Sequence, residues 1–379
     1  MVIKYLGSKR RLVPVIEDLL VRSGARTALD LFSGTTRVGR AFKARGARVT
    51  ALDSTRYAEM LARCYIATDA TQVEGDRLTA EVARLNALPG RPGYVTATFC
   101  QTARFFQPFN GERIDAVRAD LETRCDDALF PVLITSLLEA ADRVDSTTGI
   151  QMAYLKQWSD RSHKVLELRV PDLIDGPGEA VRGDALQMTG SLGSFDLAYL
   201  DPPYNQHRYL ANYHVWETIV AWDDPEHYGV AQKRIECRDP TAASAFNAKA
   251  SMPTALRQVV KEVNARVLVL SYNDESWMGL DDLVAACQPR GHVAVLGFNS
   301  TRYVGARIGI YDPSGRPVGT PGRLRNVEYL LVAGDEATVE HLVAPYAEAR
   351  ITVDDHQEGV TGGPAAQVGA GSSGHTAEA

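Results

Sequence analysis

Four residues that could bind and activate a ligand stand together in the sequence, Asp201-Pro202-Pro203-Tyr204. The two prolines fix the backbone and remove two N–H donors, so the carbonyl oxygens around them remain as acceptors. Asp201 adds a carboxylate acceptor, and Tyr204 offers a flat aromatic face. An amino group on an aromatic ring would satisfy this set, since its hydrogens could bind Asp201 and the Pro202 carbonyl while the ring stacks on Tyr204. A hydrogen bond to a charged acceptor contributes about 1.5–3 kcal/mol, and base–aromatic stacking about 1–3 kcal/mol.

A second set of candidate residues is Asp30-Leu31-Phe32-Ser33-Gly34, with Asp53 standing 23 residues after Asp30. Gly34 permits a tight turn and the close approach of a ligand. An acidic residue at the position of Asp53 can accept hydrogen bonds from both ribose hydroxyls of a nucleoside. The pairing suits an adenosine-containing cofactor, although a purely structural turn would have the same pattern. Thr36 stands where a dinucleotide-binding loop needs its second glycine, and no Gly-Lys-Ser/Thr phosphate loop follows.

Both sets directly follow runs of residues that favour β-strands. Predicted strands cover residues 27–32, 48–52, 195–200, 266–272, 292–298 and 326–332, and helical patterns lie between most of them. Such alternation is typical of a mainly parallel α/β sheet, and open sheets of this kind bind ligands beyond the carboxyl ends of their strands. The last two strands are joined by a Gly/Pro-rich connection without an obvious helix, so we expect them to pair antiparallel.

The strands are interrupted by a long, mostly helical stretch, including a buried helix that begins near Pro131. We therefore predict a catalytic domain built from residues 1–56 and 182–356, with a helical insertion at residues 57–181. Residues 357–379 are rich in Gly, Ala and Ser, and we expect them to be disordered because they have few large apolar side chains.

The composition of the 379 residues is that of a folded soluble protein, with 45% hydrophobic and 23% charged residues. The net charge is 41 − 47 = −6, but residues 1–48 carry 11 − 3 = +8. This basic block is either a polyanion-facing surface or a set of solvated helix faces. No apolar stretch suits a membrane helix or a signal peptide, so no membrane partner is expected. The five cysteines form no CxxC pair, which favours a cytoplasmic location with free thiols and disfavours a metal site.

The chain resembles the N6-adenine-specific DNA methyltransferases of the DNA adenine methylase family in four motifs that follow one another in the family's order. They are Lys4-Tyr5-Leu6-Gly7-Ser8-Lys9, Asp30–Gly34, Asp53 and Asp201–Tyr204. The resemblance covers about residues 2–334, and Gln101–Arg118 resembles the Asn-Gly-Arg stretch of the family's recognition insertion. It implies a Rossmann-like S-adenosylmethionine-dependent methyltransferase fold of the α/β class with a mostly helical inserted target-recognition domain.

The resemblance also assigns roles to residues around a bound S-adenosylmethionine. Tyr5 and Lys9 would contact the cofactor from the N-terminal arm, and Phe32, Ser33 and Gly34 would pass close to its methionine part. Asp53 would hold the ribose, Asp184 would lie near the adenine of the cofactor, and Asp30 and Asp201 complete the cofactor site. The target adenine would be held by Asp201, Pro202, Pro203 and Tyr204.

The implied reaction is methylation of the N6 amino group of adenine in double-stranded DNA, with the base flipped out of the duplex. The candidate DNA-binding residues are Arg10, Arg11, Asn110, Arg113, His207, Arg208, Tyr209 and Arg302. The implied partners are the DNA itself and a restriction endonuclease of a restriction-modification system. Rival substrates are cytosine N4, RNA adenine and a protein amide, and a rival of another class is a DNA-binding protein without catalysis. A dinucleotide oxidoreductase ranks below these because of Thr36 and the Asp-Pro-Pro-Tyr motif.

Overall fold

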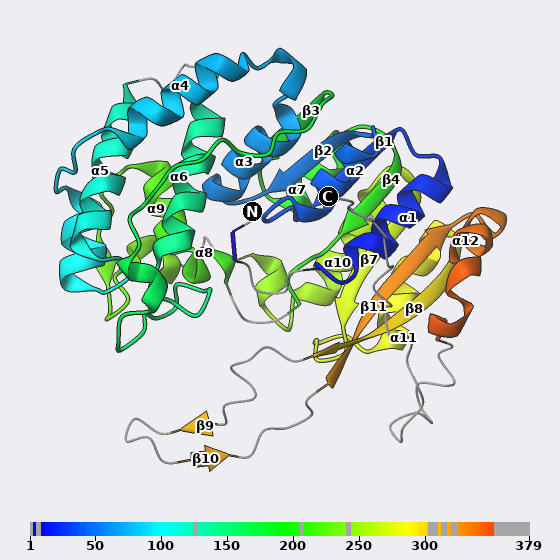
Figure 1. The fold of residues 1–379 in the computed structure, drawn as a ribbon. Coiled ribbons are helices and arrows are strands. Elements are labelled where there is room, and N and C mark those ends of the chain that lie inside the picture. The colour runs from blue at the N-terminus through cyan, green and yellow to red at the C-terminus, as the bar shows by residue number, and fades with distance from the viewer. Residues whose placement is uncertain are drawn as a thin grey trace, which may run out of the picture. The chain divides into compact units, whose positions relative to one another are not determined.

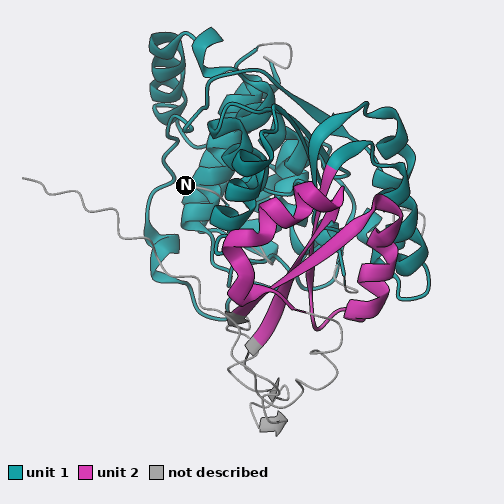
Figure 2. Cartoon of the chain, turned by 90° about the vertical axis from the view of Figure 1, so that its right-hand side faces the viewer, with its two compact units in different colours: residues 1–266 teal, residues 267–379 magenta. Residues whose placement is uncertain are grey.

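A computed structural model describes residues 3–4, 9–123, 128–204, 208–239, 244–301, 310–311, 317–319 and 325–351 of the chain (Figure 1). The chain divides into two compact units, Met1–Arg266 and Val267–Ala379 (Figure 2). Both units combine strands with helices, so the fold is mixed α/β. The first unit contains Asp30–Gly34, Asp53 and Asp201–Tyr204, which makes it the unit of interest for function.

A parallel sheet lies at the centre of the first unit, with the strand order β3-β2-β1-β4. Its strands are β3 (Gly178–Arg182), β2 (Arg48–Asp53), β1 (Thr27–Leu31) and β4 (Phe195–Leu200). The predicted strands at β1, β2 and β4 are confirmed. Four successive residues in each of these three strands are buried, as expected for a parallel sheet covered by helices.

Strand β3 was missing from the sequence prediction. Its five residues Gly-Glu-Ala-Val-Arg contain no apolar run, and none of them is fully buried. The strand is held by its pairing with β2, from Val49 opposite Gly178 to Asp53 opposite Arg182. A Cβ atom on Gly178 would lie 2.4 Å from the carbonyl oxygen of Ile66, so this close packing requires glycine.

Helices of the first unit surround this sheet and extend away from it (Figure 1). They are α1 (Val13–Ser23), α2 (Arg37–Ala44), α3 (Arg56–Ala62), α4 (Gly75–Asn86), α5 (Pro108–Glu122), α6 (Phe130–Val144), α7 (Ala185–Met188), α8 (Tyr209–Asn212), α9 (His214–Ala221) and α10 (Met252–Glu262). Two π-helical turns, η1 (Arg63–Ala67) and η3 (Thr96–Thr102), and a short hairpin of β5 (His227–Tyr228) and β6 (Lys233–Arg234) complete the unit, together with 3-10 turns. The predicted helix near Pro131 is confirmed as α6, with proline in its first turn.

A large hydrophobic core joins the helices of residues 57–144 to α9. Phe99 and Phe105 pack edge to face within it, with ring centroids 5.9 Å apart. Trp216 of α9, which is 1% exposed, packs against Phe106 at 6.2 Å. The helix that follows Asp201–Tyr204 is thus built into the same core as the helical region before it. The domain boundaries at residues 57 and 181 stay a prediction, and the predicted disordered tail, residues 357–379, lies outside the described residues.

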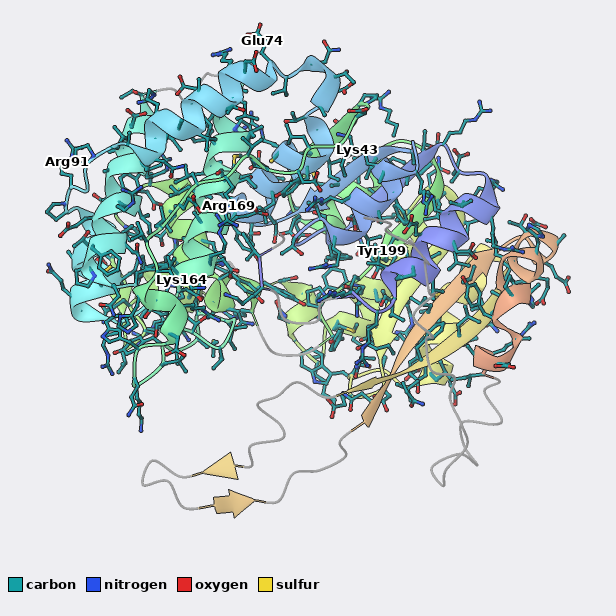
Figure 3. All side chains as sticks on the ribbon, in the orientation of Figure 1. Lys43, Glu74, Arg91, Lys164, Arg169 and Tyr199 are labelled. Atoms are coloured by element: carbon teal, nitrogen blue, oxygen red, sulfur yellow. The ribbon has the colours of Figure 1, made fainter. Side chains whose placement is uncertain are left out.

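The basic block of residues 1–48 does not form a single exposed surface. Lys43 is 2% exposed, and its Nζ donates hydrogen bonds to the carbonyl oxygens of Ile66 and Thr68 at 2.8 and 2.6 Å (Figure 3). Lys9 is also buried, whereas Arg10 and Arg11 are exposed. Part of this positive charge therefore serves internal structure, and Arg10 and Arg11 remain available to a polyanion.

The second unit contains an antiparallel sheet with the order β7-β11-β8. These strands are β7 (Ala265–Asn273, which begins two residues before the unit), β11 (Arg325–Gly334) and β8 (His292–Thr301). Helices α11 (Leu280–Cys287) and α12 (Glu336–Val343) and the small pair β9 (Ile310–Tyr311) and β10 (Pro317–Gly319) accompany them. The predicted antiparallel pairing of the last two strands, β8 and β11, is confirmed.

Three further observations bear on function. Across the described ranges, no helix is long and apolar enough to cross a membrane. Those ranges also hold no cluster of three or more His, Cys, Asp or Glu side chains placed to bind a metal. Cys64, Cys100, Cys237 and Cys287 are buried free thiols, and burial raises the pKa of the Cys237 thiol, which lies nearest the predicted site, to about 11.

Candidate active site

Strand register brings the predicted site residues to one edge of the parallel sheet. Leu31, the last residue of β1, pairs with Leu52 of β2 on one side and with Leu200 of β4 on the other. The next residues along the three strands are Phe32, Asp53 and Asp201. The loops that carry the two candidate motifs therefore start side by side at the carboxyl ends of parallel strands, where ligands bind in such sheets.

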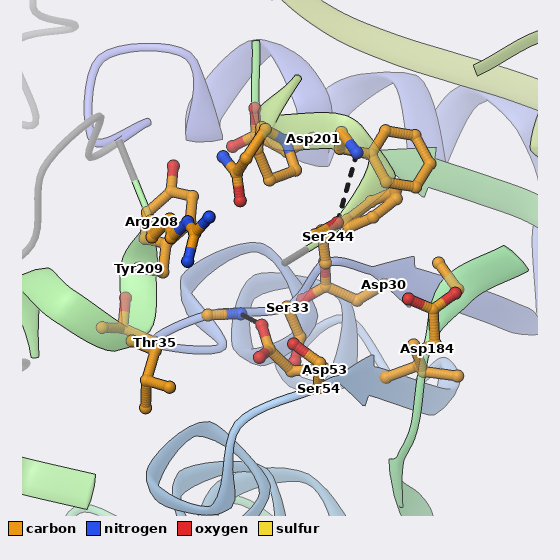
Figure 4. A pocket seen from close by; sticks show the side chains of 18 of the residues that line it. Asp30, Ser33, Thr35, Asp53, Ser54, Asp184, Asp201, Arg208, Tyr209 and Ser244 are labelled. Carbon is orange, nitrogen blue, oxygen red and sulfur yellow. Dashed lines mark hydrogen bonds between the residues drawn. The ribbon is translucent and has the colours of Figure 1, made fainter. Parts of the chain in front are cut away.

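These loops line an open cleft (Figure 4). The predicted residues that line it are Lys9, Asp30, Phe32, Ser33, Gly34, Asp53, Asp184, Asp201, Pro203, Arg208 and Tyr209. Pro202 is buried behind the lining and Tyr204 is half-buried beside it. Tyr5 lies outside the described residues.

Asp53 holds the glycine loop in place with one carboxylate oxygen. Its Oδ2 accepts a hydrogen bond from the Gly34 N–H at 3.0 Å, and its Oδ1 accepts bonds from the N–H and hydroxyl of Thr55 at 3.0 and 2.9 Å. Burial raises the pKa of Asp53, while these hydrogen bonds lower it in part. A carboxylate oxygen accepts more than one hydrogen bond, so Asp53 can hold the loop and still receive ribose hydroxyls.

The loop after β1 has an unusual backbone. Gly34 has φ +50°, but Phe32 and Thr36 also have positive φ values, +69° and +59°. Such values cost a residue with a bulky or branched side chain free energy and often mark functional loops. Thr36, at the position of the missing glycine, thus has a left-handed backbone that glycine would adopt without strain.

A third glycine of the loop pattern, Gly39, was overlooked in the sequence. Its N–H donates a hydrogen bond of 2.8 Å to Oδ2 of Asp30, and a Cβ atom at position 39 would lie 2.8 Å from the same oxygen. The spacing Gly34-x-Thr36-x-x-Gly39 was the available signal, because the third glycine of such loops permits close packing of helix and strand. Asp30 is 2% exposed, and burial is the main cause that raises its pKa to about 7, with Asp201 and Asp53 adding to the effect.

Asp201 forms an ion pair with Lys9, whose Nζ lies 3.2 Å from Oδ1. The Lys9 side chain is 6% exposed, and its Nζ also lies 5.8 Å from the centre of the Tyr204 ring. The N-terminal motif and the Asp-Pro-Pro-Tyr motif, 192 residues apart, are therefore in direct contact. The resemblance assigned Lys9 to the cofactor, and in this structure its ammonium group binds Asp201.

Asp184 lies at the far side of the cleft from Arg208 and Tyr209 (Figure 4). It caps the short helix α7, because its Oδ1 accepts a hydrogen bond from the Leu186 N–H at 2.8 Å. The backbone between β3 and α7, including Gly183 and Ala185, lines the cleft with it. An adenine ring of a cofactor could lie here, with Asp53 at the position of the ribose.

Comparison with known proteins identifies the same family as the sequence motifs do. The family model of the D12 class N6 adenine-specific DNA methyltransferases matches residues 5–280, about three quarters of the chain. The chain belongs to this family. It is 32% identical to the type II methyltransferase M.NlaIII of Neisseria lactamica over 73% of this chain and 85% of the relative. It is 26% identical to the type II methyltransferase M.FokI of Planomicrobium okeanokoites, of which it spans 47%, and 30% identical to M.CviAII of Paramecium bursaria Chlorella virus 1, of which it spans 64%.

Membership of this family gives the reaction of the chain. It is an adenine-specific DNA methyltransferase that methylates the N6 amino group, of the kind found in restriction-modification systems. The predicted reaction, methylation of an amino group on an aromatic ring, is thereby confirmed, and the binding of that group by the Asp-Pro-Pro-Tyr motif stays a prediction. The alternative that the chain is a dinucleotide oxidoreductase is excluded by this family membership.

The predicted DNA contact at Asn110 does not fit its environment in this methyltransferase. Asn110 is 0% exposed, and its side chain accepts a hydrogen bond from the Leu166 N–H at 2.8 Å and donates to the Lys164 carbonyl at 2.9 Å. Arg113, one turn further along α5, donates to the carbonyl oxygens of Leu166 and Asn86. Both side chains fix the segment around residues 162–168 to α5. We therefore do not carry them into the DNA-binding surface.

The remaining predicted DNA contacts divide into three groups. Arg10 and Arg11 are exposed at the start of α1. Arg208 and Tyr209 line the cleft, Arg208 donates to the Cys237 carbonyl at 3.2 Å, and burial raises the pKa of Tyr209 well above its usual value. His207 and Arg302 lie outside the described residues. Four of the eight predicted DNA-binding residues, namely Arg10, Arg11, Arg208 and Tyr209, thus lie in the cleft or at the exposed surface.

The residues Asn212–His214 are structural. Asn212, Tyr213 and His214 are at most 1% exposed, and burial lowers the pKa of His214 to about 3. The hydrogen bonds of Gln151 to this stretch fix it further, since the Gln151 N–H donates to the Asn212 carbonyl at 2.7 Å. These three side chains therefore belong to the packed interior of the protein and are closed to a ligand.

Several lining residues were not found from the sequence. They are Thr35, Arg37, Val38, Leu52, Ser54, Gly183, Ala185, Tyr199, Leu210, Glu236, Cys237, Ser244, Phe246 and Asn247. Phe246 packs edge to face on Phe32, with ring centroids 4.9 Å apart, so a segment far along the chain closes one wall of the cleft. No motif marks residues 236–247, and this contact could not have been predicted. Arg37, in contrast, lies within the pattern Gly34-x-Thr36-x-x-Gly39, so the sequence did contain a signal for it.

Proposed function

We propose that the cleft binds S-adenosylmethionine against the ends of β1 and β2 and the target adenine against Asp201, Pro202, Pro203 and Tyr204. The observation that carries this proposal is the strand register, which sets Phe32, Asp53 and Asp201 next to one another at one sheet edge. A methyl donor on the first two loops and an acceptor on the third would meet there. Holding two reactants in such an arrangement removes much of the entropic barrier to their reaction.

The chemistry of the lining residues suits this cofactor. Four carboxylates, those of Asp30, Asp53, Asp184 and Asp201, line the cleft, and they would favour a ligand with a cationic sulfonium group. The Ser33 hydroxyl is buried and has no hydrogen-bond partner among the described residues. Such an orphaned group is the sign of a ligand that completes its bonding. Tyr5 keeps its predicted role at the cofactor by resemblance alone.

In the proposed mechanism, Asp201 and the Pro202 carbonyl accept the two hydrogens of the adenine N6 amino group. The nitrogen lone pair is delocalised into the ring, and acceptors on both hydrogens favour a tetrahedral nitrogen whose lone pair is available. S-Adenosylmethionine supplies an electrophilic methyl group when bound. Positive charge develops on the nitrogen during transfer, and the Asp201 carboxylate is already oriented to stabilise it. Tyr204 would hold the ring by stacking.

Lys9 limits which oxygen positions of Asp201 are open to the target adenine. Its ammonium group occupies one oxygen of the Asp201 carboxylate at 3.2 Å. The amino group of a target adenine would use the remaining acceptor positions of that carboxylate. An adjacent ammonium group favours the ionised form of a carboxylate, in which both oxygens act only as acceptors. Lys9 would thus keep Asp201 ready as an acceptor.

An adenine within a duplex cannot reach this cleft, so the base must be flipped out, at a cost of a few kcal/mol. Contacts of Arg10 and Arg11 with DNA phosphates would offset part of this cost. We further propose that the helical region of residues 57–181 recognises the target sequence. A restriction endonuclease with the same recognition sequence would be the functional partner, as the type II name of M.NlaIII suggests.

The test is methyl transfer from labelled S-adenosylmethionine to DNA of varied sequence, followed by digestion and identification of the labelled nucleoside. The proposal predicts N6-methyladenine in DNA and little label in RNA or protein. Label on cytosine N4, on RNA or on a protein amide would contradict the assigned substrate. DNA binding without any transfer, unchanged in Asp201→Ala, would support the binding-protein alternative.

A further inference from the structure

One cation in the cleft lacks the partners that the others have. Lys9 pairs with Asp201 at 3.2 Å, and Arg208 donates a hydrogen bond to the Cys237 carbonyl at 3.2 Å. Arg37 is the third cation of the lining. Its Nε is buried and has no hydrogen-bond partner within the described part of the chain. A guanidinium group presents five N–H donors, so an unused Nε here means that an anionic ligand could be bound at low cost.

The surroundings of Arg37 add further positive charge to that of its own side chain. Arg37 is the first residue of α2, whose N-terminus carries neither a side-chain cap nor an acidic residue in the first turn. The positive end of the helix dipole therefore lies at the same place. Burial and the neighbouring cations Arg10 and Arg40 lower the pKa of Arg37. Arg10 and Arg37 therefore add positive charge at the N-terminal end of α2, whereas Arg40 is paired with Asp172 at 3.6 Å.

A second polar group lies in the same loop with its bonding incomplete. Ser33 is 7% exposed and lines the cleft, and its Oγ has no partner among the residues described. Figure 4 shows Ser33 between Asp30 and Asp53. Ser33 in the loop after β1 and Arg37 at the start of α2 both line the cleft, and a hydroxyl and a guanidinium are donors of the kind that bind a carboxylate.

We propose that Arg37, assisted by Ser33, binds the carboxylate of the methionine part of the cofactor and so selects S-adenosylmethionine over adenosine compounds that lack it. This inference rests on the proposed function and adds a residue to it. The four aspartates of the cleft would repel a ligand carboxylate, whereas the guanidinium of Arg37, whose Nε has no partner among the described residues, would attract it. The zwitterionic cofactor would thus be oriented by its two charges of opposite sign, with the sulfonium near the aspartates and the carboxylate at Arg37.

The test compares two ligands that differ only in this carboxylate, S-adenosylmethionine and its decarboxylated form, by isothermal titration calorimetry without DNA. In Arg37→Gln, we expect the affinity for S-adenosylmethionine to fall about 10- to 100-fold, as for loss of a charge-assisted hydrogen-bonded pair. The affinity for the decarboxylated form should change less than about threefold. The matched control is Arg45→Gln, which removes the same charge at the C-terminal end of α2, where Arg45 pairs with Glu17 and does not line the cleft. It should leave both affinities unchanged.

The outcomes separate this inference from the proposed function. Equal losses for both ligands in Arg37→Gln, or no loss for either, would overturn the role of Arg37 and leave the cofactor site intact. A loss of DNA affinity in Arg37→Gln with unchanged binding of S-adenosylmethionine would assign Arg37 to a DNA phosphate and also overturn it. Failure of the wild-type protein to bind either ligand would instead overturn the proposed cofactor site. Binding of the decarboxylated form by Arg37→Gln shows at the same time that the variant is folded.

Discussion

Two segments of this methyltransferase stood out in the sequence as family motifs, and the structure uses them differently. Asp30–Gly34 continues from a buried parallel strand into the cleft, with Ser33 left without a partner in the described structure. Phe109–Arg113 lies within helix α5, where Asn110 and Arg113 bind backbone groups of residues 86 and 162–166. The difference follows from position. A loop at the carboxyl end of parallel strands has polar groups that the sheet cannot satisfy, whereas polar groups on a packed helix can be satisfied by neighbouring chain.

The largest expected effect concerns the cleft. Asp201→Asn keeps an acceptor oxygen but removes the negative charge that faces the developing positive charge on the target nitrogen. We expect the rate of methyl transfer at saturating DNA and cofactor to fall about 100- to 1000-fold, measured in a single-turnover assay. The affinity for S-adenosylhomocysteine should change less than about tenfold.

Asp196 provides the control for that experiment, because it stands at the amino end of the same strand and accepts hydrogen bonds from the N–H groups of Arg26 and Thr27 at 2.8 and 2.9 Å. Asp196→Asn should leave the transfer rate per folded molecule within about twofold. If Asp201→Asn lowers the transfer rate no more than Asp196→Asn does, the carboxylate at the carboxyl end of β4 has no special role in catalysis, and the account is contradicted.

The next effect concerns the helical segment. Asn110→Ala should lower the free energy of unfolding by about 2–4 kcal/mol, because it leaves buried backbone groups of residues 162–166 without partners. Urea denaturation measures this loss. At a temperature where the variant stays folded, its DNA affinity should match that of the wild type. A large loss of DNA affinity with normal stability would return Asn110 to the DNA-binding surface.

Ionisation of Asp30 should make the free energy of unfolding depend on pH. Burial raises its pKa from 3.8 in the unfolded chain to about 7 in the folded protein, so between these pH values the folded state binds more protons than the unfolded state. Its contribution to stability therefore decreases as pH rises through this window, by on the order of 4 kcal/mol. Thermal unfolding without cofactor should show Asp30→Asn equal to wild type near pH 4 and more stable than wild type near pH 8. Parallel pH curves for the two proteins would contradict the assignment.

The smallest effect is expected at Thr36. Since Thr36 already has φ +59°, Thr36→Gly relieves backbone strain but also removes a buried side chain and adds freedom to the unfolded chain. These contributions nearly cancel, so the stability should change by less than about 1 kcal/mol and the cofactor affinity by less than about threefold. A tenfold gain in cofactor affinity in calorimetry would mean that Thr36 keeps the backbone away from the ligand.

The sequence was sufficient for the parts of the site whose geometry is local. Strand periodicity located β1, β2 and β4, and parallel pairing then required Asp30, Asp53 and Asp201 to meet at one edge. Local pattern was insufficient where tertiary packing decides. Strand β3 has no apolar run and depends on β2, and the polar run Asn212–His214 is buried by the core of the helical region.

The lining residues between 236 and 247 are also a part of the cleft that local sequence pattern did not predict. Phe246 reaches Phe32 only because the chain returns to the sheet edge more than 200 residues later. The ion pair of Lys9 with Asp201 likewise depends on the path of the N-terminal arm, and the motif could place Lys9 near the site without naming its partner. Contacts between distant segments are thus what the structure adds to the sequence.

The most direct test of the central claim, that the Asp201–Tyr204 corner binds the amino group that becomes methylated, is the N6-methyladenine content of DNA from cells that express each variant. We predict N6-methyladenine with the wild type and with Asn110→Ala at a temperature where it is folded, and almost none with Asp201→Asn at equal protein level. N6-methyladenine at the wild-type level with Asp201→Asn would contradict the account.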